Sequence, residues 1–221
     1  MSPSSPLLLQ DRAAAGRRLV EPLRQYAHRP DVIVLALPRG GVPVAYEVAM
    51  ALEVRLDLML VRKLGAPSNE EFALGAIASG GIQILNDHAL RAHPIDQATF
   101  DAVVAREKRE LLRREQAYRG TREPVPLKDQ VVILIDDGLA TGASMMAAIQ
   151  AVRLQAPSRI VVAVPVAPIE TVEALRSEVD ELICPVVPDW FMSLGHWYMD
   201  FSQTSDAEVI KLLQRAWQRE A

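Results

Sequence analysis

The stretch VVILIDDGLATGAS, residues 131–144, decides the fold of this chain. Its first five residues, Val131 to Ile135, are all apolar, which is typical of a strand that is buried on both faces in a parallel sheet. Asp136 and Asp137 follow at the carboxyl end of this strand, where open α/β sheets bind their ligands. A turn of small residues then leads into a predicted helix over about 142–155.

The turn between this strand and this helix is suited to an anion. A helix N-terminus offers unpaired backbone N–H groups and the positive end of the helix dipole. Thr141 and Ser144 add hydroxyl donors, and Gly142 lets the backbone approach a ligand closely. These features predict a phosphate on the turn and hydroxyls or a metal ion on the two carboxylates, so a sugar phosphate would satisfy both. The alternative is that Asp136 and Asp137 only end the strand and cap the helix, which the full fourteen-residue pattern disfavours.

The chain on either side of this stretch predicts the rest of a parallel sheet. Val32 to Leu37 is a second apolar run, and it ends at Pro38-Arg39-Gly40-Gly41 before a predicted helix over 42–52. A strand over 54–61 would complete a βαβ unit with a glycine-rich first turn. Further strands are predicted over 160–166 and 182–187. The predicted fold class is therefore α/β, with a Rossmann-like central parallel sheet flanked by helices.

Several segments lie outside this sheet. Residues 62–71 are polar and punctuated by Gly and Pro, which predicts a mobile loop. Residues 72–85 predict a β-hairpin that turns at Gly80-Gly81. Residues 87–118 form a long arginine-rich helical segment, interpreted as a solvated amphipathic helix, a lid or a contact between copies of the chain, with a phosphate-binding role less favoured. Further helices are predicted over 11–25, over 168–177 and after Asp206, which would cap the last one.

Length and composition place the chain among globular α/β proteins. Its 221 residues are 50% hydrophobic and 24% charged, which suits one domain over 8–221. Within it we expect a core over about 30–187, a helical insertion over about 87–120, and a small C-terminal hood over about 187–206, followed by the last helix. The formal net charge of -4 gives no basic surface for nucleic acid.

Cysteine usage and hydropathy predict a cytoplasmic protein. The single cysteine, Cys184, excludes an internal disulfide and is interpreted as a core thiol at a strand end rather than a nucleophile. No apolar run approaches the roughly 20 residues that span a membrane. The first residues do not resemble a secretory leader. We therefore expect no membrane partner.

Rival site patterns fit the chain poorly. The Walker pattern needs a Gly-Lys pair and the dinucleotide fingerprint needs G-x-G-x-x-G, and the chain has neither. A serine hydrolase would need G-x-S-x-G, which is also absent. A receiver-like domain would need acidic residues after the first strand, where Pro38-Arg39-Gly40-Gly41 stands instead.

Residues 131–144 resemble the motif with which type I phosphoribosyltransferases bind 5-phosphoribosyl-1-pyrophosphate (PRPP). The resemblance implies that Asp136 and Asp137 hold the ribose 2′- and 3′-hydroxyls. Gly138 and Ala140 depart from the residues common at their positions, which loosens the turn but keeps its donors. The tail 197–203, WYMDFSQ, points to a bacterial subgroup of the family. The resemblance also implies that the turn cradles the 5′-phosphate through Ala140, Thr141, Gly142, Ala143 and Ser144.

Two further segments match the same family. Pro38-Arg39-Gly40-Gly41 resembles its pyrophosphate loop, in which backbone N–H groups and an arginine grip the diphosphate. Arg62 and Lys63 stand where the family has a flexible loop that closes over PRPP, with Arg62 assigned to the pyrophosphate. Each segment has a simpler interpretation: a plain glycine-rich turn for the first, and solvent-exposed loop charge for the second.

The resemblance implies an enzyme that transfers the phosphoribosyl group of PRPP to a small-molecule acceptor, in the family usually a nitrogenous base, and releases pyrophosphate. Asp136, Asp137, Arg39 and Lys63 would be the catalytic residues. Mg²⁺ would be the cofactor, held through the substrate near the two aspartates. The alternative is a non-catalytic regulatory protein of the same fold that binds PRPP or a nucleotide.

Aromatic residues cluster in the expected hood, at Trp190, Phe191, Trp197 and Tyr198. They could stack a planar acceptor, form the hood's own small core, or contact a second copy of the chain in a homodimer. The sequence leaves these alternatives open, together with the identity of the acceptor.

Overall fold

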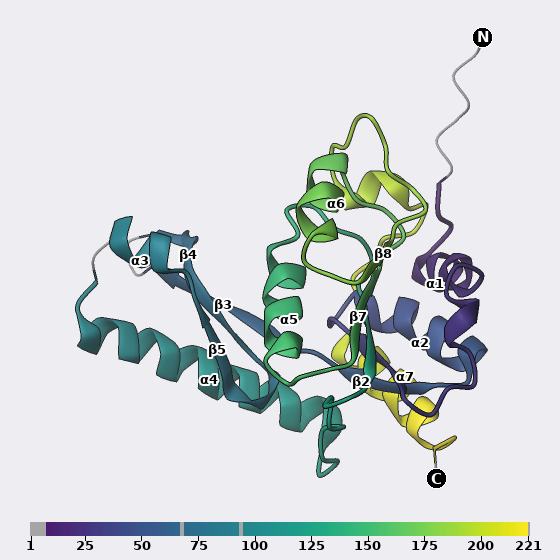
Figure 1. Ribbon diagram of the computed structural model, residues 1–221, viewed down its shortest axis with the longest axis horizontal. Coiled ribbons are helices and arrows are strands. Elements are labelled where there is room, and N and C mark those ends of the chain that lie inside the picture. The colour runs from purple at the N-terminus through teal and green to yellow at the C-terminus, as the bar shows by residue number, and fades with distance from the viewer. Residues whose placement is uncertain (1–7, 67–68, 93–94, 221) are drawn as a thin grey trace.

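A five-stranded parallel sheet forms the centre of the computed structural model, which describes residues 8–66, 69–92 and 95–220. The strand order is β2-β1-β6-β7-β8. Figure 1 shows the sheet between its two layers of helices. Strands β1 and β6 are neighbours in register, with Ala36 opposite Ile135, although about a hundred residues separate them. The strands are β1 (Val32–Ala36), β2 (Arg55–Leu58), β6 (Val131–Ile135), β7 (Arg159–Ala163) and β8 (Glu181–Ile183).

Helices cover both faces of this sheet, as predicted for the α/β class. One face carries α1 (Arg12–Val20), α2 (Gly41–Leu52) and α7 (Asp206–Trp217), and the other carries α5 (Ala143–Arg153) and α6 (Ile169–Arg176) (Figure 1). Successive residues of a strand point to opposite faces. Residues 133 and 135 of β6 therefore join the core beneath α1, α2 and α7, while residues 132 and 134 join the core beneath α5 and α6.

A second, antiparallel sheet projects from the body and forms an arm, defined here as residues 61–119. Its strand order is β3-β4-β5, and Figure 1 shows it with α3 and α4 on the left. The predicted hairpin that turns at Gly80-Gly81 is confirmed, and both glycines adopt positive φ. The elements of the arm are β3 (Val61–Ala66), β4 (Asn69–Ala78), β5 (Ile82–Leu85), α3 (Asp87–Ala92) and α4 (Gln97–Arg119).

The single strand predicted over 54–61 is wrong, because the structure divides it between the two sheets. The N–H of Met59 still donates to the carbonyl of Ala36 in the central sheet, at 2.9 Å. One residue later the carbonyl of Leu60 accepts from the N–H of Ser79 in the arm, also at 2.9 Å. An apolar run cannot show this change of partner, because both environments bury its side chains.

The mobile loop predicted over 62–71 is also wrong for most of its length. Strand β3 pairs with β4 from Val61 opposite Ala78 to Ala66 opposite Asn69, with irregular register near Gly65. Residues 67 and 68 lie outside the described part of the chain. Cross-strand pairing therefore overrides the polar composition that favoured a loop.

Three predictions about helices need correction. The segment over 87–118 forms two helices, α3 and α4, rather than one. The last helix is capped by Ser205 and not by Asp206, because the Ser205 hydroxyl accepts the N–H of Glu208 at 3.2 Å and Asp206 is already helical. The first helix ends at Val20, before Pro22, and is continued by a short 3-10 turn.

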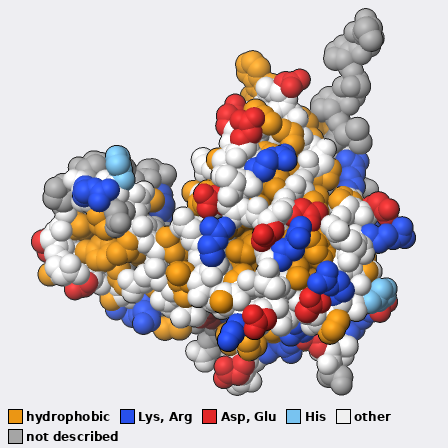
Figure 2. All heavy atoms as spheres, in the orientation of Figure 1, with side chains coloured by type: hydrophobic (Ala, Val, Ile, Leu, Met, Phe, Trp, Pro, Cys, Tyr) orange, Lys and Arg blue, Asp and Glu red, His pale blue; other side chains and the backbone are white. Residues whose placement is uncertain are grey.

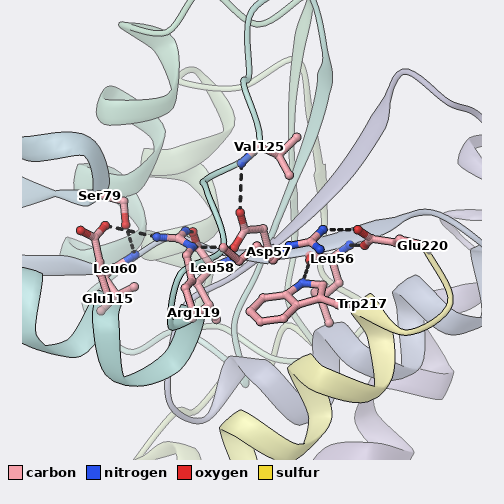
Figure 3. Close-up of polar contacts among 11 residues, drawn as sticks. Leu56, Asp57, Leu58, Leu60, Ser79, Glu115, Arg119, Val125, Trp217 and Glu220 are labelled. Carbon is pink, nitrogen blue, oxygen red and sulfur yellow. Dashed lines mark hydrogen bonds and ion pairs between the residues drawn. The ribbon is translucent and has the colours of Figure 1, made fainter.

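A buried polar network holds the arm to the body (Figure 3). Arg119, at the end of α4, donates to Asp57 Oδ1 at 2.8 Å and to the carbonyl of Leu58 at 2.6 Å. Asp57 also accepts from the N–H of Val125 at 3.2 Å. The indole N–H of Trp217 on α7 donates to the carbonyl of Leu56 at 2.8 Å. Strand β2 is thereby tied to both the arm and the C-terminal helix.

Candidate functional site

The glycine-rich turn after β1 and the acidic pair after β6 meet in the structure. A Cβ atom added to Gly40 would lie 2.0 Å from Asp137 Oδ2, and one added to Gly41 would lie 3.1 Å from Asp136 Oδ1. Backbone and carboxylates therefore approach closely because both positions lack a side chain. The peptide bond between Pro38 and Arg39 in this turn is cis.

The acidic pair is enclosed by protein on several sides. Asp137 is buried, and its Oδ2 accepts a hydrogen bond from Arg12 Nε at 2.7 Å. The Tyr198 hydroxyl donates to the backbone carbonyl of Asp137 at 2.5 Å. The N–H of Asp137 donates to Asp136 Oδ1 at 2.8 Å. These contacts fix the orientation of both side chains.

Burial raises the pKa of Asp136 well above its usual range, and the negative charge of Asp137 beside it adds to the effect. Ionisation of both carboxyl groups at once is therefore unfavourable. Ligand hydroxyls or a divalent cation at this edge of the sheet would offset the repulsion.

The turn from Ala140 to Ser144 leads into α5 as the sequence predicts. Gly142 precedes the helix with φ of 71° and has no side chain to cap it, while the Thr141 hydroxyl accepts the N–H of Ala143 at 3.4 Å. A Cβ atom at Gly142 would meet the Thr171 methyl group at 2.7 Å, so α6 packs directly behind the turn. The Thr171 hydroxyl also donates to the carbonyl of Ala140 at 2.6 Å. Ala140, Thr141, Ala143 and Ser144 are exposed, so the N-terminus of α5 is accessible to an anion.

Lys63 faces the same region from the arm. It lines a cavity of about 410 Å³ together with Ala143 and Ser144 at the start of α5. Apolar side chains of both walls, such as Ile84 and Met146, complete the lining. Figure 2 shows the hollow between the arm and the body. The structure thus brings the predicted lysine and the predicted phosphate turn to one cavity, although Lys63 lies on a strand and not on a loop.

The other two predicted cations have partners outside this cavity. Arg39 Nη1 lies 3.7 Å from Asp206 Oδ1 at the start of α7. Arg62 donates from Nε and Nη2 to Glu107 Oε2 of α4, at 2.8 and 2.5 Å. The Arg62–Glu107 pair joins β3 to α4 within the arm.

The four predicted aromatic residues of the hood fall into two groups. Tyr198 is buried, and Trp197 is half-buried against the core beneath α1, α2 and α7. Trp190 is 78% exposed, and Phe191 is half-buried. Tyr198 and Trp197 therefore belong to the core beneath α1, α2 and α7 and not to a separate small core of the hood, while Trp190 is accessible for stacking.

Sequence reasoning missed Arg12 and the residues that hold it. The Arg12 guanidinium lies 4.1 Å over the Phe201 ring and donates from Nη1 to the carbonyl of Ser202 at 2.5 Å. Arg12 stands 125 residues before Asp137 and 190 before Ser202, so no local pattern reports these contacts. The only trace in the sequence is an arginine at the first turn of a predicted helix.

Among the described residues, no helix combines the length and the apolar character needed to cross a bilayer. This finding concerns the helices alone.

Comparison with known proteins defines the class to which this chain belongs. The family model for the phosphoribosyl transferase domain matches residues 8–201, and the chain belongs to this family. Its fold is the type I phosphoribosyltransferase fold, as predicted.

Particular relatives agree with this assignment. A protein of Mycobacterium tuberculosis strain H37Rv, named provisionally as a phosphoribosyl transferase, is 43% identical over 209 residues, which cover 95% of this chain and 47% of that protein. The chain thus spans about half the length of this relative. The crystal structure of TT1426 from Thermus thermophilus is 44% identical, with a TM-score of 0.83, covering 94% of this chain and 98% of that one. The AQ2163 protein from Aquifex aeolicus shares the fold at 12% identity, with a TM-score of 0.51 over 83% of this chain and 76% of that one.

Proposed function

We propose that this chain binds Mg²⁺-PRPP and transfers its phosphoribosyl group to a small-molecule acceptor, a nitrogenous base, with release of pyrophosphate. The contact between Gly40 and Asp137 carries this proposal, because it unites two predicted subsites. The turn at 38–41 would bind pyrophosphate, and Asp136 with Asp137 would bind ribose. The exposed N-terminus of α5 would bind the 5′-phosphate.

In this proposal the protein stabilises charge and needs no covalent nucleophile. Asp136 and Asp137 orient the ribose and support positive charge that develops at its C1 atom. The backbone N–H of Gly40 and the cation of Lys63 stabilise the departing pyrophosphate, while the N–H of Gly41 already donates to the carbonyl of Leu37 at 3.1 Å. Carboxylate and phosphate oxygens are the ligands that Mg²⁺ prefers, so this donor set fits the metal, which would neutralise the leaving group.

Arg39 and Arg62 enter the proposal only if their present contacts change. Arg39 would have to leave Asp206, and Arg62 would have to leave Glu107. Movement of the arm toward α5 would narrow the cavity beside Lys63 and exclude water from PRPP. We assign Arg39 to the pyrophosphate, to which it would turn after leaving Asp206. Arg62 mainly has a structural role, because its ion pair with Glu107 joins β3 to α4.

Calorimetric titration of PRPP with Mg²⁺ tests the donor site. We expect binding to the wild type and its loss in Asp136→Asn/Asp137→Asn. Asp101→Asn, which neutralises an exposed carboxylate on α4, is the matched control and should bind normally. A folded wild-type protein that does not bind PRPP would refute the proposal.

A second pair of variants tests the role of Lys63. Lys63→Met should weaken PRPP binding about tenfold, as expected for one charge-assisted contact to a phosphate. Lys108→Met removes the same charge from an exposed position on the arm and should leave binding unchanged. Screening bases for pyrophosphate release then separates a transferase from a regulatory protein that only binds PRPP.

A further inference from the structure

Arg12 joins three segments that are distant in the sequence. It is the first residue of α1, and its guanidinium contacts Asp137 after β6 and both Phe201 and Ser202 in the hood. Only 12% of its side chain is exposed. An arginine buried this far is normally paired and hydrogen-bonded, and here each contact uses a different part of the planar group.

The position of Arg12 is fixed by the helix that carries it. Asp11 caps α1, because its Oδ1 accepts the N–H of Ala14 at 2.7 Å. Helix α1 packs closely on α2 at Gly16, where a Cβ atom would lie 2.5 Å from the carbonyl of Val44. Since α2 begins at Gly41, the last residue of the turn at 38–41, Arg12 and that turn are held by the same pair of helices.

Arg12, Gly40 and Asp137 meet at one point. A Cβ atom on Gly40 would lie 2.0 Å from Asp137 Oδ2 and 3.2 Å from Arg12 Nε. The Asp137 carboxylate is thus confined between the turn and the guanidinium. Tyr198, which donates to the Asp137 carbonyl, packs against Phe201 with ring centroids 4.8 Å apart, so the hood holds both the arginine and the aspartate.

We propose that Arg12 is a positioning residue of the PRPP site, which orients the Asp137 carboxylate and couples it to the hood through Phe201 and Ser202. This inference rests on the proposed function. Arg12 lowers the net negative charge of the acidic pair, and this favours the approach of a polyanionic substrate. A lysine would supply the charge but not the planar fork that reaches Asp137 and the Ser202 carbonyl together.

The test compares two ligands on four proteins: wild type, Arg12→Gln, Arg12→Lys and Arg18→Gln. Arg18 is an exposed residue in the last turn of α1 and serves as the matched control. The ligands are Mg²⁺-PRPP and inorganic phosphate, measured by calorimetry, with thermal unfolding as a check of folding. Phosphate probes the anion-binding turns at 38–41 and 140–144 without the ribose subsite, so a general collapse of the site would weaken both ligands.

We expect Arg12→Gln to weaken PRPP binding about 10- to 100-fold, which is the usual effect of losing a charged hydrogen bond, while phosphate binding stays the same. Arg12→Lys should recover part of the loss, and Arg18→Gln should match the wild type. In a double-mutant cycle, Arg12→Gln should add little to Asp137→Asn, because the two side chains act as one unit.

Three outcomes would overturn the inference. Unchanged PRPP binding in Arg12→Gln would show that Arg12 only connects α1 to the hood and does not position the PRPP site. Equal losses for PRPP and phosphate would show a general structural effect. Failure of the wild type to bind PRPP would refute the proposed function itself and this inference with it.

Discussion

Arg119 and Asp57 form an ion pair at 2.8 Å, with only 5% and 2% of the two side chains exposed. The pair joins the end of α4 to β2, at the point where the chain leaves the central sheet for the arm (Figure 3). Leu58 contributes a carbonyl and Val125 an N–H to this pair, and Glu115 Oε1 of the same helix lies 3.3 Å from Arg119 Nη1.

Removing one partner of this pair should destabilise the protein strongly. Arg119→Met leaves the Asp57 carboxylate buried without its cation, which typically costs about 3–5 kcal/mol. Urea unfolding measures the loss, and Arg113→Met, at an exposed position on α4, is the control. The double variant Arg119→Met/Asp57→Leu should recover part of the loss, because it removes the buried carboxylate of Asp57 and leaves only the less deeply buried Glu115 without its arginine partner. A cost below about 1 kcal/mol for Arg119→Met would contradict this interpretation.

Gly40→Ala should impair PRPP binding with little effect on folding. Gly40 has ordinary right-handed helical φ and ψ, so alanine strains no backbone angle. The added methyl group would instead displace the Asp137 carboxylate, which lies 2.0 Å from the Cβ position. We expect PRPP affinity to fall at least about tenfold, since small displacements of a positioned group are costly. Gly195→Ala, whose nearest contact would be an ordinary 3.6 Å, should bind PRPP as the wild type does.

Asp136→Asn should make the ligand-free protein more stable than the wild type, and this difference in stability should grow as the pH rises. The folded state raises the pKa of Asp136, so it favours the protonated form more than the unfolded chain does. The stability contributed by this group is therefore fully present below the ordinary pKa of about 3.9 and is lost as the pH climbs toward the raised value. Asparagine keeps the acceptor for the Asp137 N–H without the charge. Unfolding curves at about pH 4 and about pH 8 should diverge, with the variant more stable at the higher pH. Parallel curves would count against a raised pKa.

Cys184 should react slowly with thiol reagents. Burial raises its pKa to about 11, and its thiol lies 3.3 Å from the carbonyl of Val186. At about pH 8 the thiolate fraction would be on the order of 100-fold smaller than for a free cysteine of pKa about 8.5. The rate of reaction with an aromatic disulfide reagent in native and in denaturant-unfolded protein measures the difference. Equal rates would refute the interpretation of Cys184 as a core thiol.

Sequence patterns predicted those elements whose environment is uniform along their length. Strands β1 and β6 are fully buried and appear as unbroken apolar runs. The hairpin turn appears because Gly80 and Gly81 occupy conformations with positive φ, which glycine adopts readily. The prediction of a single strand over 54–61 was wrong because the two ends of this segment pair with different sheets. The hydropathy pattern does not show such a change of partner, since both environments bury apolar side chains.

The sequence by itself determined the α/β class, the small-residue turn before α5 and the acidic pair at the end of β6. Each of these depends on neighbours in the chain, whose hydropathy, conformational freedom and charge can be read locally. Only the tertiary structure decided that Gly40 touches Asp137, that Lys63 faces Ser144 across a cavity, and that Arg12 holds the acidic pair. Such contacts join residues tens to more than a hundred positions apart, and packing places them together only when the whole sheet forms.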